Sequence, residues 1–215
     1  MKPWSTLASV ATPEGALELR QRGEAEFLIV IGGRVLMTTT ARRSEEALAE
    51  LAALRGAMRV LVGGLGMGFT LRATLDALGP AARVTVAELN ADVLAWCRGP
   101  LAPITGGAVL DPRVTVVLGD VARVIADAAA SFDAILLDLY EGPHAATQRG
   151  DDPFYSAAAL ARSRAALVAG GVLAVWSEDA DEPFAKRFAA AGFTVTTHRI
   201  GSGGRRHVVY VGKRR

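Results

Sequence analysis

The chain has 215 residues, of which 51% are hydrophobic and 21% charged, enough apolar material for one folded domain with a small addition. No apolar run approaches the roughly 20 residues of a membrane span, and the first residues lack the apolar segment of a signal peptide. A single cysteine, Cys97, excludes an internal disulfide and fits a buried structural thiol in a reducing cytoplasm. Three scattered histidines show no metal-ligand spacing, so no metal is expected. With a net charge of +2, the basic C-terminal residues are interpreted as a solvated strand edge and not as a nucleic-acid surface.

The first 56 residues predict a small β region followed by one helix. Strands are expected over residues 16–20, 26–31 and 34–37. Ser44 is the expected N-cap of the helix, and Glu45 and Glu46 then occupy the first turn, where the helix dipole favours acids. This helix should end at Gly56 and lead into the main domain.

A glycine-rich turn joins a strand to a helix within residues 59–88. The turn contains Gly63, Gly64, Gly66 and Gly68. Glycine permits a tight turn and lets a ligand lie against the backbone, and the following helix N-terminus offers free N–H groups. The next strand ends on Glu88, about 20 residues after the last glycine, the spacing of an acid that binds ribose hydroxyls. The stretch therefore predicts a nucleoside-binding βαβ unit; a glycine-rich turn in a plain α/β domain is the alternative.

Strands and helices alternate through the remaining chain, which predicts a parallel sheet. Further strands are expected over residues 114–118, 134–137 and 172–176, with a final hairpin over 193–200 and 206–211. Helices are expected over residues 90–98, 120–130, 154–168 and 182–191. Residues 139–153 form a long loop that we expect to cover the ligand pocket, with Tyr140 and His144 as candidate acceptor contacts; a solvated loop histidine is the alternative for His144.

Five parallel strands followed by a hairpin resemble the class I methyltransferase fold, which binds S-adenosylmethionine (AdoMet). This is a Rossmann-like α/β fold with a mostly parallel seven-stranded sheet and a C-terminal antiparallel hairpin. The resemblance covers residues 57–212 and leaves a small N-terminal β appendage outside it. We therefore expect two parts, an appendage with its linking helix over residues 1–56 and an AdoMet-binding domain over residues 57–215.

Within that superfamily, the motifs of the chain resemble those of the spermidine synthases and their relatives. The matching motifs are Asp111-Pro112-Arg113-Val114 ahead of Gly119-Asp120, then Asp133-Ala134-Ile135-Leu136-Leu137-Asp138 ahead of Glu141-Gly142-Pro143, then Phe154-Tyr155, and finally Val168-Ala169-Gly170-Gly171-Val172. Together with the β appendage these motifs span most of the chain.

Acidic residues follow the carboxyl ends of the predicted parallel strands, where such sheets bind ligands. Glu88 is the expected ribose ligand, and Asp120 with the Val121 backbone is expected at the adenine amino group; helix capping is an alternative role for Asp120. By resemblance, Asp138 would hold or deprotonate an acceptor amine, and Glu141 matches a second catalytic acid of the family. The alternative for both is a polar loop that caps strand ends.

The chain also departs from the spermidine synthase pattern. Gly66 stands where that family carries an Asp that, by resemblance, holds the amine of decarboxylated AdoMet. A glutamine is replaced near Met37, and Trp176 replaces another. Because an acid at position 66 would repel the carboxylate of intact AdoMet, these departures favour intact AdoMet as the co-substrate.

The favoured prediction is therefore methyl transfer from AdoMet to an unidentified acceptor. One alternative is aminopropyl transfer from decarboxylated AdoMet, the spermidine synthase reaction of polyamine biosynthesis. The other is a non-catalytic nucleoside-binding domain, since a fold does not dictate a function. The expected partner is a small-molecule acceptor, with amines as candidates, and a homodimer is compatible with the sequence. Neither a membrane nor nucleic acid is expected as a partner.

Overall fold

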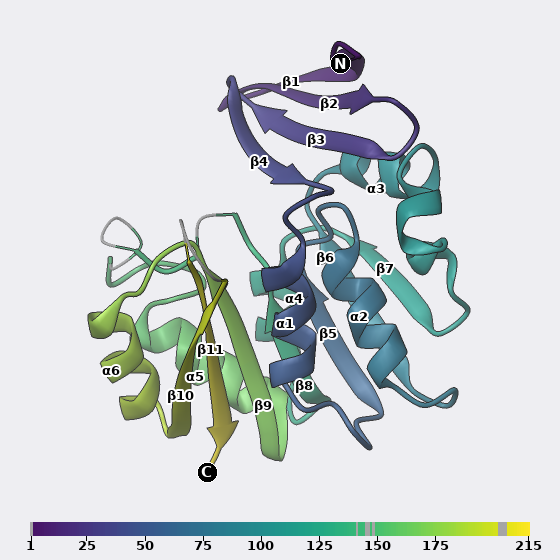
Figure 1. Cartoon of the computed structure of the whole chain (residues 1–215). Helices are drawn as coiled ribbons and strands as arrows, with labels where there is room; N and C mark the ends of the chain where they lie inside the picture. The colour runs from purple at the N-terminus through teal and green to yellow at the C-terminus, as the bar shows by residue number, and fades with distance from the viewer. Residues whose placement is uncertain (1, 141, 145–146, 148, 202–205) are drawn as a thin grey trace.

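A computed structural model of the chain describes residues 2–140, 142–144, 147, 149–201 and 206–215. Two sheets are present: a four-stranded antiparallel sheet lies over one end of a seven-stranded sheet that carries helices on both faces (Figure 1). The predicted α/β fold with an N-terminal β appendage is thereby confirmed. None of the helices in the described residues is long and apolar enough to cross a membrane.

The N-terminal sheet has the order β1-β2-β3-β4. Its strands are β1 (Ser5–Thr12), β2 (Gly15–Arg22), β3 (Glu26–Ile31) and β4 (Arg34–Thr38). The sequence prediction lacked β1, which is an edge strand with mostly exposed side chains and therefore shows little apolar periodicity. β3 is buried more strongly: Phe27, Ile29 and Val30 are each at most 2% exposed.

The seven-stranded sheet has the order β10-β11-β9-β8-β5-β6-β7. Its strands are β5 (Arg59–Gly63), β6 (Arg83–Glu88), β7 (Val114–Leu118), β8 (Phe132–Leu137), β9 (Leu167–Ser177), β10 (Phe193–Ile200) and β11 (His207–Arg214). The first five are parallel, and β11 inserts antiparallel between β9 and β10. The glycine strand β5 lies between β6 and β8, so the ends of those two strands flank the glycine turn.

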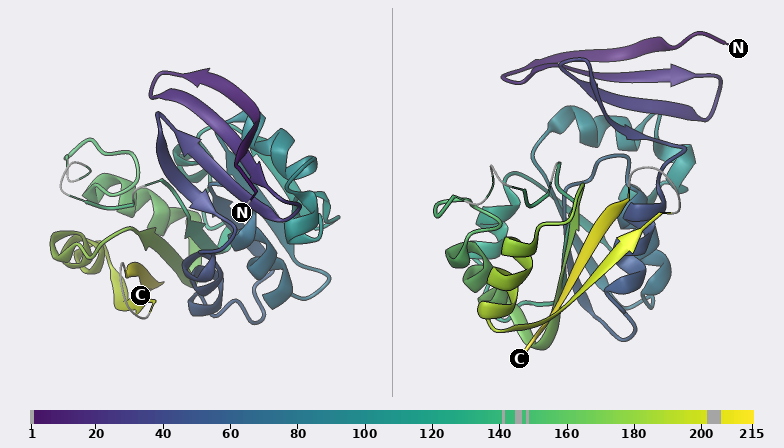
Figure 2. Two further views of the ribbon diagram at one scale, coloured as in Figure 1. Left: turned by 45° about the horizontal axis from the view of Figure 1, so that its top comes forward. Right: turned by 60° about the vertical axis from the view of Figure 1, so that its left-hand side comes forward.

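Helices cover both faces of this sheet (Figure 2). They are α1 (Arg43–Leu51), α2 (Phe69–Ala77), α3 (Ala91–Arg98), α4 (Val121–Ala126), α5 (Ala157–Ala166) and α6 (Glu182–Ala190), with short 3-10 turns η1 (Ala102–Thr105) and η2 (Ala108–Leu110). Successive side chains of a strand point to opposite faces. Thus Val60 and Val62 join the core beneath α1, α2 and α3, whereas Leu61 joins the core beneath α4, α5 and α6.

Two helix starts differ from the prediction. The α1 helix begins at Arg43, so Ser44 is not its N-cap; the Ser44 hydroxyl instead donates to the Glu45 carboxylate. The α5 helix begins at Ala157, three residues later than predicted, because Ser156 caps it by accepting the Ala159 N–H at 3.2 Å.

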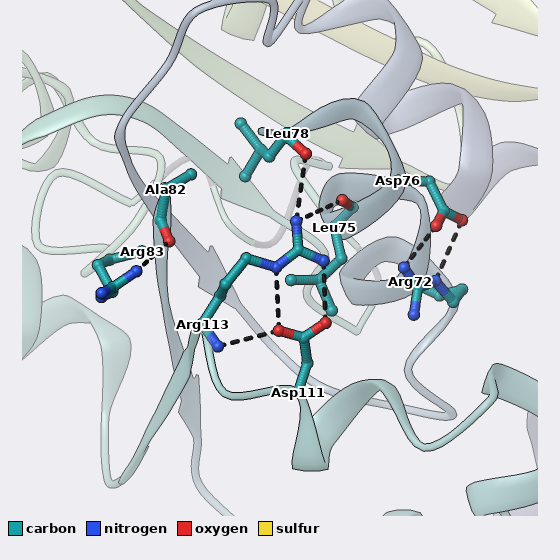
Figure 3. A network of polar contacts seen from close by, with 8 residues as sticks. All are labelled: Arg72, Leu75, Asp76, Leu78, Ala82, Arg83, Asp111 and Arg113. Atoms are coloured by element: carbon teal, nitrogen blue, oxygen red, sulfur yellow. Dashed lines mark hydrogen bonds and ion pairs between the residues drawn. The ribbon is translucent and has the colours of Figure 1, made fainter. Parts of the chain in front are cut away.

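The Asp111-Pro112-Arg113 motif has a structural role (Figure 3). Arg113 donates through Nε and Nη2 to the two oxygens of Asp111, each at 2.9 Å. Its Nη1 donates to the carbonyl oxygens of Leu75 and Leu78, at 2.9 and 3.2 Å, near the C-terminal end of α2. Hydrogen bonds from the guanidinium hold the pKa of Asp111 at about 2. The motif therefore ties the start of β7 to the helix that follows the glycine turn.

Candidate functional site

A cavity of about 470 Å³ lies at the carboxyl ends of β5, β6 and β8, and the N-terminal sheet contributes to its wall. Among the described lining residues, six carry carboxylates and one, Arg34, is basic. The acids are Glu14, Glu45, Glu88, Asp120, Asp138 and Glu178. The cavity is thus strongly anionic although the whole chain has a net charge of +2.

The glycine turn forms part of the cavity wall through Gly64 and Gly66. Gly64 has a φ of +86°, and a Cβ placed there would lie 2.2 Å from the Asp138 carbonyl oxygen. A side chain at this position would therefore separate the ends of β5 and β8. Gly63 and Gly68 are not among the described lining residues; Gly63 instead makes room for the Val121 side chain, 2.8 Å from where its Cβ would be.

Glu88 ends β6 in the cavity wall and is only 8% exposed. Its Oε2 accepts the Leu65 N–H, and its Oε1 accepts the Asn90 N–H, both at 2.8 Å. These bonds attach the carboxylate to the glycine turn on one side and to the start of α3 on the other. Each oxygen has a second lone pair, so the carboxylate can still accept hydrogen bonds from a ligand.

Asp120 and Val121 lie beyond Glu88, at the start of α4, and both line the cavity. Asp120 caps α4, since its Oδ1 accepts the Ala122 N–H at 2.8 Å. The capping role considered from the sequence is therefore present, and the same residue also faces the cavity. We call Glu88, Asp120 and Val121 the Glu88 side of the cavity.

Asp138 follows β8 on the other side of the glycine turn. Its Oδ2 lies 2.6 Å from the Thr70 hydroxyl, which is also 3.2 Å from the Glu45 backbone oxygen. Burial, together with the charge of Glu45, raises the pKa of Asp138 to about 7. The predicted second acid, Glu141, lies outside the described residues.

Glu45 was missed as a site residue, because the sequence indicated only a helix-dipole role. It is 8% exposed and lines the same cavity as Asp138. Burial raises its pKa, although the Ser44 hydroxyl opposes that shift. A signal was present in the sequence: Glu45 precedes the apolar Leu48 and Ala49 by three and four residues, on the buried face of α1. We call Asp138 and Glu45 the Asp138 side of the cavity, together with buried Thr70, which contacts both residues but does not line the cavity.

Two departures from the spermidine synthase pattern, Gly66 and Met37, are in contact. A Cβ placed on Gly66 would lie 2.4 Å from the Met37 sulfur, and Met37 belongs to β4 of the N-terminal sheet. The methionine therefore occupies the space that an acidic side chain at position 66 would need. Cys97 of α3 contacts the same turn, because its thiol donates to the Gly66 carbonyl oxygen at 3.2 Å.

Cys97 is buried, as predicted, and burial together with the charge of Glu88 raises its pKa to about 12. A thiol with such a pKa is a poor nucleophile near neutral pH. Its role in this site is structural.

Arg34 of β4 bridges to the other end of the chain at the cavity wall. It forms an ion pair with Glu178 at 3.1 Å, and its guanidinium lies 5.1 Å from the centre of the Tyr140 ring. All three residues line the cavity. The loop after β8 therefore contributes Leu139 and Tyr140 to the cavity, whereas His144, the other predicted contact, is not among the described lining residues.

Comparisons with known proteins agree with this geometry. The family model of the spermine/spermidine synthase domain matches residues 42–187. A polyamine aminopropyltransferase of Mycobacterium tuberculosis is 31% identical over 192 residues, and one of Corynebacterium efficiens is 32% identical over 163 residues. These alignments cover 84% and 74% of the chain but only 35% and 30% of the relatives. The chain thus matches about a third of the length of these curated relatives.

Solved structures show the same fold. Spermidine synthase from Thermotoga maritima superposes with a TM-score of 0.79 at 18% identity, covering 97% of this chain and 72% of that one. A spermidine synthase in complex with the transition state analogue AdoDATO also gives a TM-score of 0.79, at 17% identity, and covers 97% of this chain and 73% of that one.

The prediction of methyl transfer is wrong by these findings. The family match and the curated relatives support aminopropyl transfer, which the sequence analysis kept as its alternative. The absence of an acid at position 66 does not exclude an ammonium ligand, since another buried carboxylate, Glu45, lines the same cavity. The strand order, the motifs and the match over residues 42–187 together show that the chain belongs to the spermine/spermidine synthase domain family.

Proposed function

We propose that the chain is an aminopropyltransferase that moves the 3-aminopropyl group of decarboxylated AdoMet to an amine acceptor. The observation that carries this proposal is the anionic cavity at the carboxyl ends of the parallel strands, with six carboxylates and one basic residue among its described lining residues. Decarboxylated AdoMet has a sulfonium and an ammonium group, and an alkylamine acceptor is also a cation near neutral pH. Such a cavity raises the local concentration of both substrates.

The lining supports a nucleoside on the Glu88 side. The Glu88 carboxylate can accept from both ribose hydroxyls, and Asp120 can accept from the adenine amino group. Apolar contacts for the base are available, because Val93, Leu89 and Val121 line the same cavity. Gly64 allows a ligand to approach the backbone without meeting a side chain.

The amines belong to the Asp138 side. The reaction requires a neutral acceptor nitrogen, whose lone pair attacks the carbon next to the sulfonium. A new C–N bond forms, the C–S bond breaks with its electron pair passing to sulfur, and methylthioadenosine leaves. Asp138 accepts the proton that the nitrogen loses. Its pKa of about 7 suits a base that works near neutral pH.

Aromatic residues also line the cavity. Tyr140, Phe154 and Trp176 all line the cavity. The faces of aromatic rings attract cations, at roughly 0.5–2 kcal/mol each. They also exclude water, which would otherwise compete for the carboxylates.

The test is to incubate the purified chain with decarboxylated AdoMet and a series of primary diamines. We expect release of methylthioadenosine and a diamine that has gained one aminopropyl group, both measured by mass spectrometry. A parallel incubation with intact AdoMet should give no methylated amine. Binding of methylthioadenosine without turnover on any amine would favour the non-catalytic nucleoside-binding alternative, and the absence of both would refute the proposal.

A further inference from the structure

The two carboxylates of the Asp138 side, buried Glu45 and half-buried Asp138, lie where three elements meet. Glu45 comes from α1, Asp138 follows β8, and Thr70 of α2 contacts both residues, through the Glu45 backbone oxygen and the Asp138 side chain. Both carboxylates line the cavity. The charge of Glu45 contributes to the raised pKa of Asp138.

Three of the other four carboxylates of the cavity already have partners. Glu88 accepts two backbone N–H groups, Asp120 caps α4, and Glu178 pairs with Arg34. Glu14 lies in an exposed turn at the cavity rim. Glu45 and Asp138 differ, because each carboxylate has a hydroxyl as its described partner, Ser44 for Glu45 and Thr70 for Asp138, and neither forms an ion pair within the part of the chain that the structure describes. The charge of His207 favours ionisation of Glu45, but the two groups are not hydrogen bonded in that part.

The Thr70 hydroxyl links Glu45 and Asp138. A hydroxyl has one hydrogen to donate, yet Thr70 Oγ1 lies within hydrogen-bond distance of two acceptors. Both contacts are satisfied when Asp138 carries a proton, since Asp138 then donates to Thr70 and Thr70 donates to the Glu45 carbonyl. A bound ammonium would favour the ionised form of Asp138, and the Thr70 hydroxyl could then donate to that carboxylate.

The glycine turn provides no acid for this task. Position 66 is glycine, and the Met37 side chain fills the space beside it. A substrate ammonium in this part of the cavity must therefore find its carboxylates elsewhere.

We propose that Glu45, together with Asp138, binds a primary ammonium group of the substrates, and that it replaces the acid missing from the glycine turn. We call this pair the ammonium site. An ammonium has three N–H donors, and two carboxylates on one side of it can accept them together. This inference rests on the proposed function, because both the donor tail and the acceptor are primary alkylammonium ions.

The test compares Glu45→Gln with Glu46→Gln. Glu46 is the neighbouring acid on α1; it pairs with Arg42 at 3.1 Å and does not line the cavity, so its variant controls for the loss of one charge from the helix. Three titrations are made by calorimetry: methylthioadenosine, which has no ammonium; decarboxylated AdoMet; and 1,4-diaminobutane in the presence of methylthioadenosine.

We expect Glu45→Gln to weaken binding of an ammonium ligand roughly tenfold or more, because a hydrogen bond to a charged group is lost. Methylthioadenosine binding should stay within about twofold, since that ligand has no ammonium group to bind there. Loss for decarboxylated AdoMet alone assigns the site to the donor tail, and loss for the diamine alone assigns it to the acceptor. Glu46→Gln should change none of the three affinities.

Equal affinities of the unmodified protein and Glu45→Gln for both ammonium ligands would overturn the inference while leaving the proposed function intact. If methylthioadenosine fails to bind the unmodified protein, the proposed function falls, and the diamine titration without it still tests the ammonium site. Should Glu45→Gln fail to fold, Ser44→Ala removes the hydroxyl that holds the Glu45 carboxylate. We then expect binding of the same ammonium ligand to weaken roughly threefold, the effect of one lost hydrogen bond.

Discussion

The two sides of the cavity hold their carboxylates in different ways. On the Glu88 side, Glu88 and Asp120 accept backbone N–H groups from the turns that follow their own strands or from the neighbouring glycine turn. On the Asp138 side, Asp138 and Glu45 contact hydroxyl groups, and the charge of Glu45 contributes to the raised pKa of Asp138. Backbone groups therefore orient the first pair, whereas the second pair keeps its capacity for a proton or a cation. Removing one acid from each side should have different consequences.

The largest effect is expected from Asp138→Asn. If Asp138 accepts the proton of the acceptor amine, its loss should lower kcat/KM for aminopropyl transfer roughly 10²–10⁴-fold. Methylthioadenosine binding should be retained, since the Glu88 side is unchanged. Steady-state kinetics and calorimetry on the same preparation check both statements. A variant with more than half of the original activity would remove Asp138 from the chemistry.

A smaller effect, on the opposite side, is expected from Glu88→Gln. The amide can no longer accept on both ends, so ribose hydroxyls and backbone N–H groups compete for one oxygen. We expect methylthioadenosine to bind about ten- to a hundredfold more weakly, equivalent to roughly 1–3 kcal/mol. The melting temperature is the control, because Glu88 also ties the glycine turn to α3. Unchanged affinity would show that the ribose lies elsewhere.

The comparison also predicts how stability depends on pH. The pKa of Asp138 is raised to about 7 in the folded chain, so the unfolded chain loses this proton first, near pH 4. The contribution of protonated Asp138 to the stability of the fold is fully present below about pH 4 and is lost as pH rises towards 7. In urea unfolding, the free energy of unfolding of Asp138→Asn should therefore rise relative to that of the unmodified protein, by on the order of 1–3 kcal/mol between pH 5 and pH 8. A constant difference across that range would contradict the raised pKa.

The smallest effect concerns the contact between Gly66 and Met37. Gly66→Asp should destabilise the protein by about 1–2 kcal/mol, because φ is +51° and the new side chain meets the Met37 sulfur. Met37→Ala should relieve part of this cost, which would appear in a double-mutant cycle as a coupling of at least ~0.5 kcal/mol. Additive effects would show that backbone strain alone is responsible.

Much of the fold and of the Glu88 side could be predicted from the sequence. Strand, glycine turn, helix and spaced acid follow one another between residues 59 and 88, so local order alone indicates the ligand-binding end. The same rule placed Asp120 and Asp138 at strand ends. These predictions depend only on the sheet being parallel, and that followed from the alternation of strands and helices.

The Asp138 side could be predicted only in part. Glu45 faces Asp138 because α1 packs beside α2, and Met37 reaches Gly66 because β4 lies over the glycine turn. Both contacts join segments that are far apart in the sequence or belong to different sheets, and no local pattern encodes them. The exposed edge strand β1 was missed for a related reason, since its pairing with β2 and not its own periodicity defines it.

The ion pair between Arg113 and Asp111 responds to acid at a different pH from Asp138 in the cavity. The pKa of Asp111 is lowered to about 2, so its contribution is present above about pH 4 and is lost only as pH falls through 2. Asp138 takes up its proton several pH units higher. During acidification Asp138 is therefore protonated first, while the end of α2 remains held by Arg113. Mild acid should therefore protonate Asp138, the proposed base, reversibly and without loosening the helix that follows the glycine turn.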